Sequence, residues 1–376
     1  MTRPPKTTRR MHALTITWIV GLALLPLGCG RAPAADVIDG GTHDLATQGS
    51  SGSSSAASSS TGSSIGTGAS ANVASAIAST LIERMPDAPF NVHFEGTREL
   101  VQTIESGGQR IQHHFQEKVG ADGSGKFAIE AELLSGPQDP EIFALKQLPQ
   151  QGHNYRQRDF RIRDLQLFRQ SYQLTMTDAD VPIAGINCVE FQVGRNDGSP
   201  AHYTVHVDPS SALVLRSEER DATGVVVARM EYSSIEYGAD LSDMVLTDGR
   251  MQREELDVNT LIDDSASTLG FEMRIPTLPA PGFELDTATH LTDPAGRHWL
   301  KLSYLDGVEV LTFMHRAQNV PAPGSLDQVS SGEATVITLG NLVVVSGEID
   351  RTGFVITGRA LEDDLLTMVG SALATN

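Results

Sequence analysis

The sequence predicts an α+β protein in which a helix precedes a curved antiparallel sheet and a small α+β domain follows. Three observations lead to this fold class. A helical pattern ends at Pro86, short alternating apolar and polar runs then continue to residue 237, and a second series of strands closes with a helical pattern. Many antiparallel strands with short turns favour a half-barrel, which is a sheet that wraps around the leading helix without closing.

The leading helix is predicted over 72–85. Asn72 is a candidate N-cap, Ile77 and Leu81 have helical spacing, and Pro86 ends the pattern. The period then becomes two, and turns rich in glycine and aspartate separate the runs. The predicted strands of this unit are 90–94, 111–119, 127–133, 189–193, 201–207, 213–219 and 225–237.

A polar, acidic stretch over 236–268 and a proline-rich stretch over 276–283 precede the second unit. Its predicted strands are 298–304, 308–315, 333–337, 342–349 and 353–357, and its closing helix is 359–373. The chain therefore divides into a signal peptide with a lipobox (1–29), a Ser/Gly-rich flexible tether (30–71), the half-barrel domain (72–240), a linker (241–268) and a C-terminal domain (269–376).

The N-terminus has the layout of a secretory signal. Four basic residues precede an apolar run over 13–27 that is too short to span a bilayer. Cys29 follows as in a bacterial lipobox, and we therefore expect it to be acylated. Pro26 departs from this motif, because a leucine is usual at its position. An ordinary cleaved signal and a retained anchor are the alternatives. All three place the protein in the cell envelope. Gly30 favours a periplasmic protein anchored in the outer membrane over an inner-membrane or soluble one.

Composition excludes some classes of partner. The chain has 28 Lys and Arg against 47 Asp and Glu; four of the basic residues lie in the first 28 residues, so the remainder carries 24 against 47, a net charge of −23. So acidic a body repels nucleic acid, which we do not expect as a partner. With only Cys29 and Cys188, a disulfide framework is not expected either.

Several segments resemble the MucB/RseB family of periplasmic sigma-factor regulators. In the first unit they are VPIAGINC over 181–188, YTVHVDPSSALVLRSE over 203–218 and MEYSSIEYG over 230–238. In the second unit they are LPAPGFEL over 278–285, the Tyr-x-Asp-Gly turn in YLDGV over 304–308, and VVVSGEI over 343–349. The resemblance covers about residues 88–373.

The resemblance implies a fold and a function. The N-terminal domain would be built like the lipoprotein carriers LolA and LolB, with a concave face that takes a lipid or acyl chain. The C-terminal domain would bind the periplasmic part of a membrane anti-sigma factor, and this binding would keep an extracytoplasmic sigma factor silent. Lipid binding would relieve the silencing.

An open sheet would turn one set of apolar side chains inward, where they would line a ligand pocket. The alternative is a sealed core, and the pattern alone does not decide between them. The candidate ligand-binding residues are Phe94, Phe115, Phe127, Ile129, Leu167, Leu174, Phe191, Val205 and Leu215.

A basic cluster over 156–169 stands out in this acidic chain. Arg161 and Arg163 alternate with Phe160 and Ile162, so a strand would show one arginine face, either solvated and paired with carboxylates or docking an acidic partner or a lipid phosphate. The candidate partner-binding residues are Arg161, Arg163, Tyr304, Asp306 and Gly307.

The sequence offers no catalytic or metal-binding motif, so we expect neither an enzyme nor a metal or cofactor. His113 and Glu117 share a strand face but are about 13 Å apart along it. His202 and His206 are read as part of a solvated face, and Cys188 as a buried, inert thiol.

These observations predict a non-enzymatic envelope lipoprotein, anchored to the membrane through its N-terminal lipid, that regulates a sigma factor through its anti-sigma factor. The main alternative is a lipid or lipoprotein carrier or acceptor of the LolA/LolB type. A structural envelope lipoprotein that binds nothing small is the third reading.

Overall fold

The computed structural model of the protein describes residues 77–106, 109–141, 143, 158–196, 203–221, 223–248, 274–292, 298–317, 334–339, 341–349 and 352–373. The predicted signal peptide, Cys29 and the tether lie outside these residues. So do the predicted linker from residue 249 onward and His202.

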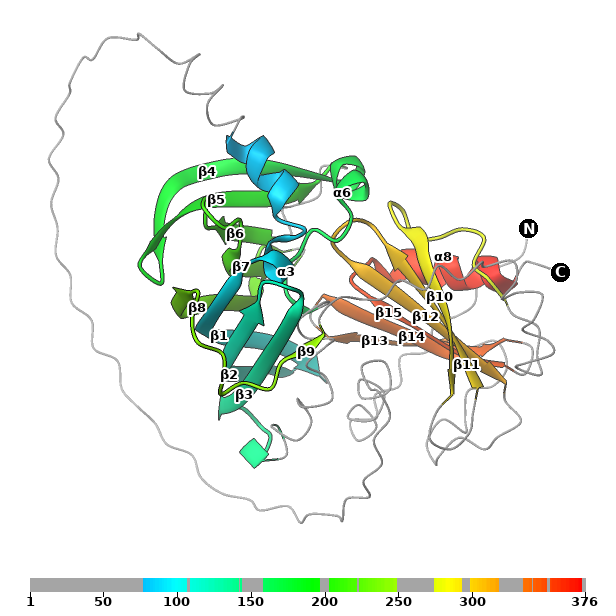
Figure 1. The fold of residues 1–376 in the computed structure, drawn as a ribbon. Helices are drawn as coiled ribbons and strands as arrows, with labels where there is room; N and C mark the ends of the chain where they lie inside the picture. Colours follow the sequence, from blue (N-terminus) through cyan, green and yellow to red (C-terminus); the bar gives the residue numbers. More distant parts are fainter. Residues whose placement is uncertain are drawn as a thin grey trace, which may run out of the picture.

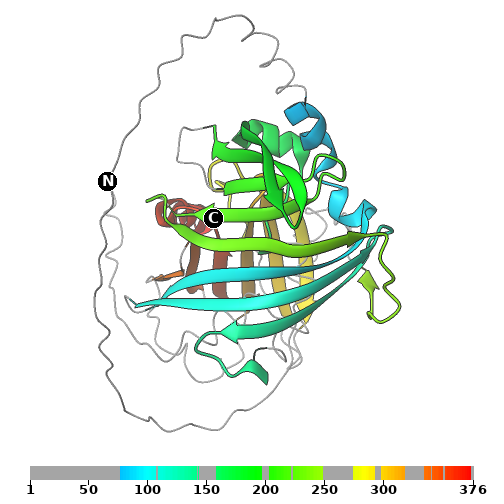
Figure 2. The same ribbon diagram turned by 90° about the vertical axis from the view of Figure 1, so that its left-hand side faces the viewer.

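The first sheet is a nine-stranded antiparallel half-barrel (Figures 1 and 2). Its order is β4-β5-β6-β7-β8-β1-β2-β3-β9, and no pairing joins the end strands β4 and β9 among the described residues. The strands are β1 (His93–Ser106), β2 (Gln109–Asp122), β3 (Lys126–Ser135), β4 (Tyr172–Ile183), β5 (Ile186–Arg195), β6 (Tyr203–Val207), β7 (Val214–Arg220), β8 (Val226–Tyr237) and β9 (Thr247–Asp248).

The core of this unit fills the concave side of the sheet. The leading helix, described over 77–84, contributes Leu81, and Met85 follows it. Helix α6 (Leu165–Ser171) contributes Phe168; Asp164 caps its N-terminus by accepting a hydrogen bond from the Leu167 amide. The helix and the strands thus share one buried cluster, which is why the sheet wraps around them.

Three local features differ from the predicted elements. The predicted strand 90–94 begins with a one-turn helix, α3 (Ala88–Asn91), because Pro89 favours the first helical turn. Strand β4 was not predicted: its alternation is interrupted by register shifts between Met176, Asp178 and Val181. Strand β9 lies in the stretch read as a bridge and pairs with β3.

The second sheet has six antiparallel strands in the order β10-β11-β12-β15-β14-β13. The strands are β10 (Glu284–Thr292), β11 (His298–Leu305), β12 (Val310–Ala317), β13 (Thr335–Leu339), β14 (Leu342–Ile349) and β15 (Thr352–Gly358). Helix α8 (Glu362–Leu373) buries Leu365, Met368 and Val369 against the sheet (Figure 1). The predicted α+β class is confirmed, whereas β10 was not predicted.

In the part of the chain that the structure describes, no helix has both the length and the apolar character needed to cross a membrane.

Candidate functional site

The inward side chains of the half-barrel form a filled core. Seven of the nine candidate ligand-binding residues are at most 2% exposed: Phe94, Phe115, Phe127, Ile129, Phe191, Val205 and Leu215. Leu174 is partly buried against this core. Leu167 lies on α6, whose buried residue is Phe168, so it does not point inward from a strand as the pattern suggested. A role of these residues in ligand binding stays a prediction.

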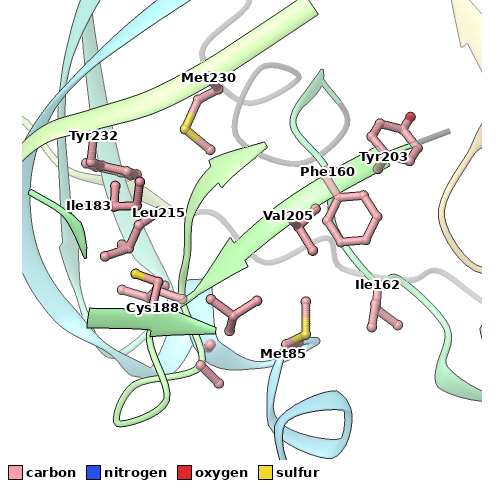
Figure 3. Packing of buried hydrophobic residues seen from close by; sticks show 14 of the residues in the cluster. Met85, Phe160, Ile162, Ile183, Cys188, Tyr203, Val205, Leu215, Met230 and Tyr232 are labelled. Carbon is pink, nitrogen blue, oxygen red and sulfur yellow. The ribbon is translucent and has the colours of Figure 1, made fainter. Parts of the chain in front are cut away.

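A small cavity lies beside this core among the described residues. Its volume is about 50 Å³, and its walls include Met85, Phe160, Ile162, Met230 and Tyr232, all seen in Figure 3. Ligand pockets for small molecules have volumes of roughly 300–1,000 Å³. The half-barrel therefore has no room for an acyl chain in this cavity unless part of its wall moves.

A buried ion network occupies the polar wall of this cavity. Arg98 and Glu117 are directly opposite on β1 and β2, and Arg98 Nη2 lies 2.7 Å from Glu117 Oε2. Arg158 Nη1 is 2.7 Å from Glu117 Oε1, and Asp159 lies within 3 Å of both arginines. Burial alone would raise the pKa of Glu117, but Arg158 and Arg98 hold it below its ordinary value. The four groups are therefore all charged at neutral pH.

The network continues into the basic segment 158–164, which is not the predicted arginine-faced strand. Among the described residues this segment pairs with no strand. Arg161 is buried, with its guanidinium 4.0 Å from the centre of the Phe90 ring, and Arg163 donates to the carbonyl of Val308 in the second unit. The prediction of a solvated strand was therefore wrong, because Arg161 packs over the Phe90 ring and Arg163 binds a carbonyl of the second unit.

The two units meet at the β11–β12 turn, residues 306–309, which we call the joint turn. Asp306 accepts hydrogen bonds from the hydroxyl of Tyr172, at 2.6 Å, and from Nη1 of Arg195, at 3.2 Å. Burial, followed by the charge of Glu309, raises the pKa of Asp306. Val308 is 1% exposed and belongs to the core of the first unit, so the turn is inserted into that core.

A second polar group extends the contact between the units. Arg359 Nε lies 2.8 Å from Glu219 Oε1, and Arg359 Nη1 lies 3.3 Å from Glu309 Oε2. Glu309 also accepts a hydrogen bond from Tyr203, and Asn341 donates to Glu219 at 2.9 Å. Residues from β6, from β7 and from loops of the second unit thus form one largely buried network.

The candidate partner-binding residues of the second unit lie in or beside the joint turn. Asp306 is 0% exposed. Gly307 has φ +103° and its carbonyl accepts from the amides of Arg163, at 2.8 Å, and Asp164. Tyr304 is 1% exposed and packs in the core of the second unit. Their role in binding another protein stays a prediction.

His206 and Cys188 are both buried in the first unit. His206 is 2% exposed and its Nε2 lies 3.0 Å from Glu190 Oε2, so the prediction that it lies on a solvated face was wrong. Burial and then Arg216 lower its pKa. Cys188 is buried, and burial raises the pKa of its thiol to about 12. No group of three His, Cys, Asp or Glu side chains in the described residues could hold a metal ion.

Two features of this site were missed in the sequence. Arg98 shares a strand face with Phe94 and Leu100, and Glu117 shares one with Phe115 and Val119, so both patterns place a charge on an inward face. This pattern of charges among apolar residues could have predicted the buried ion pair. The pairing of Asp306 with Tyr172 depends on how two sheets dock, which no local pattern carries.

No protein-family model matches the chain, and no curated protein matches it. Solved structures are similar to it. MucB in complex with MucA(peri) is 16% identical, with a TM-score of 0.47, and the match covers 79% of this chain and 97% of that one. The MucA/MucB complex of Pseudomonas aeruginosa has the same identity and coverage and a TM-score of 0.45. An outer membrane lipoprotein-sorting protein domain from Vibrio parahaemolyticus is 12% identical, with a TM-score of 0.19, over 46% of this chain and 96% of that one.

Proposed function

We propose that this chain is a non-enzymatic regulator of the cell envelope that binds the periplasmic part of a membrane anti-sigma factor and thereby controls an extracytoplasmic sigma factor. The sequence resemblance to the MucB/RseB family over both units supports the proposal. The protein would act in the periplasm, attached to the outer membrane through a lipid on Cys29.

The insertion of the joint turn into the first core carries the proposal. Val308 is buried among residues of the half-barrel. Asp306 accepts a hydrogen bond from Tyr172, and Glu309 accepts one from Tyr203. The half-barrel therefore holds the second sheet beside it through this turn. A carrier needs only a half-barrel, whereas a regulator that couples ligand binding to partner binding needs both units in one body.

The volume of the interior bears on the rival function, a lipid or lipoprotein carrier. A carrier needs a chamber for acyl chains when it is loaded, and the cavity here is about 50 Å³. A lipid sensor needs such a chamber only in one of its two states, because a switch depends on a difference in ligand affinity between states. The filled interior fits the ligand-free state of a sensor, and the attached second unit is the feature that distinguishes this chain from an unloaded carrier.

The experiment that tests the proposal is site-specific photo-crosslinking of the full-length protein in its native cell, followed by mass spectrometry. The exposed Leu361, beside α8, probes the second unit, and the exposed Val245 probes the first. We expect the crosslinker at Leu361 to capture a single-span inner-membrane protein encoded beside a sigma factor, and the crosslinker at Val245 to serve as the matched control. Capture of assorted lipoproteins or lipid-transport components, without such a partner, would support the carrier instead.

A further inference from the structure

The half-barrel interior contains a charge-balanced cluster that its apolar surroundings do not require. Arg98 is 4% exposed and Glu117 is 0% exposed, although apolar side chains occupy the neighbouring inward positions of both strands. Burying ion pairs is costly, and a well-packed apolar pair of similar volume is often at least as stable. The cluster is therefore a candidate for a functional role.

The members of the cluster differ in how firmly they are held. Arg98 and Glu117 belong to paired central strands, and Arg158 donates two hydrogen bonds to Glu117, at 2.7 and 2.8 Å. Asp159, in contrast, begins the segment 159–164, which pairs with no strand among the described residues and which we call the strap. Asp159 Oδ2 is 2.8 Å from Arg98 Nη2, and Asp159 Oδ1 is 2.9 Å from Arg158 Nε. Removing Asp159 would leave two arginines against one carboxylate, a net charge of +1 in a buried place.

The surroundings of Arg98 define what could replace Asp159. The cavity beside the ion pair is lined by Met85, Phe94, Met230 and Tyr232, and the strap covers it with Phe160 and Ile162. An anionic group would restore neutrality at Arg98 and accept the same charge-assisted hydrogen bonds. An apolar chain attached to that group would contact the apolar walls.

We propose that Arg98 binds the anionic group of an amphiphile whose apolar chain enters under the strap, and that Asp159 occupies that position while the half-barrel is closed. The inference deepens the lipid-sensing part of the proposed function and rests on it. Asp159 acts as an internal competitor, so a ligand binds only when it displaces the strap.

The strap also connects this site to the second unit. The amides of Arg163 and Asp164 donate to the carbonyl of Gly307, and Arg163 donates to the carbonyl of Val308. Displacement of the strap from Arg98 would therefore move Arg163 and Asp164, which hold the joint turn. Ligand entry and the position of the second sheet would be coupled through the six residues of the strap.

The test compares two fluorescent probes of identical chain, cis-parinaric acid and the corresponding alcohol, on the full-length protein and on Asp159→Asn. Asp180→Asn removes the same charge from an exposed position on β4 and is the matched control. We expect the unmodified protein to prefer the acid over the alcohol. Asp159→Asn should tighten acid binding about tenfold, the factor that about 1.4 kcal/mol represents, with little change for the alcohol; Asp180→Asn should change neither.

Three results would overturn the inference. These are no preference for the acid in the unmodified protein, equal gains for acid and alcohol in Asp159→Asn, and displacement of the acid by inorganic phosphate at a comparable concentration, which would identify a free-anion site. If Asp159→Asn does not fold, the unmodified protein tests the inference alone: a preference for the acid over the alcohol supports it, and no preference overturns it. Failure here together with capture of the membrane partner at Leu361 would leave the proposed regulator standing without this ligand.

Discussion

Tyr172, the first residue of the edge strand β4, donates a hydrogen bond of 2.6 Å to Asp306 in the turn of a different sheet. Both side chains are buried, at 4% and 0% exposure. A buried carboxylate is costly unless it is hydrogen-bonded, and Asp306 also accepts from Arg195 and from the amides of Val308 and Glu309. The contact between the two units is therefore polar and directional, and it fixes one arrangement of the sheets.

Tyr172→Phe should destabilise the protein by about 1–2 kcal/mol, because the substitution leaves a buried carboxylate with one hydrogen bond fewer. The measurement is the free energy of unfolding in urea. Trp299, in β11, reports on the second sheet by fluorescence, and far-UV circular dichroism reports on both sheets.

Tyr237→Phe is the matched control for this substitution. Tyr237 also donates to an aspartate, Asp208, but both residues belong to the first unit. We expect the unfolding transitions of Tyr237→Phe, followed by fluorescence and by circular dichroism, to coincide as they do in the unmodified protein. An equal effect of both variants on the second sheet would contradict a role of Tyr172 in joining the units.

Gly307→Ala should separate the two units more severely. A Cβ atom at Gly307 would lie 2.3 Å from the amide nitrogen of Phe168 and 2.6 Å from its Cα, so backbone must move. Gly185 also has positive φ, at +78°, but no atom lies within 4 Å of its added Cβ. Gly185→Ala therefore has the same kind of backbone strain, about 1 kcal/mol, without the clash.

We expect only Gly307→Ala to split the single urea transition into two, with Trp299 fluorescence and circular dichroism no longer coincident. Limited proteolysis should then cleave the variant between the units faster than the unmodified protein. Equal behaviour of the two alanine variants would show that the joint turn tolerates displacement.

Arg359→Met tests the second polar group of the joint. It would leave Glu219 and Glu309, whose side chains are only 9% and 10% exposed, without their shared cation. Loss of one partner of a buried pair typically costs about 3 kcal/mol or more. Arg169→Met, which breaks an exposed pair with Glu83, should cost less than about 1 kcal/mol. Similar losses in urea denaturation for both variants would contradict the joint as a buried network.

The sequence predicted the inward face of the half-barrel well, because burial of one face of a strand imposes a regular pattern on it. Phe115, Phe127 and Phe191 sit in strands with one buried face, where a strict period of two is the only pattern that keeps apolar side chains inside. Strand β4 escaped prediction because it is an edge strand, largely exposed and bulged near Asp178, so burial does not impose that period on it.

The candidate site was predicted less well than the fold. The alternation of Phe160 and Ile162 with Arg161 and Arg163 predicts a strand, but the same alternation arises here in an unpaired strap that packs between two units. The Tyr-x-Asp-Gly pattern predicts a turn at Asp306 and Gly307. Their burial depends on docking against Tyr172 and Phe168, which are more than 130 residues away in the chain.

His315, buried in β12, should make the second unit sensitive to mild acid. Burial, followed by the charge of Arg274, lowers the pKa of His315 from its ordinary value of 6.5 to about 4. Between these two values the unfolded chain binds a proton that the folded chain does not, so stability present above pH 6.5 is lost as the pH falls toward 4. The slope for one group is at most about 1.4 kcal/mol per pH unit. We expect urea denaturation followed by Trp299 fluorescence to show this slope between pH 6.5 and 5, and His315→Gln to reduce it. If the slope is the same in both proteins, the loss of stability arises elsewhere and His315 does not titrate with unfolding.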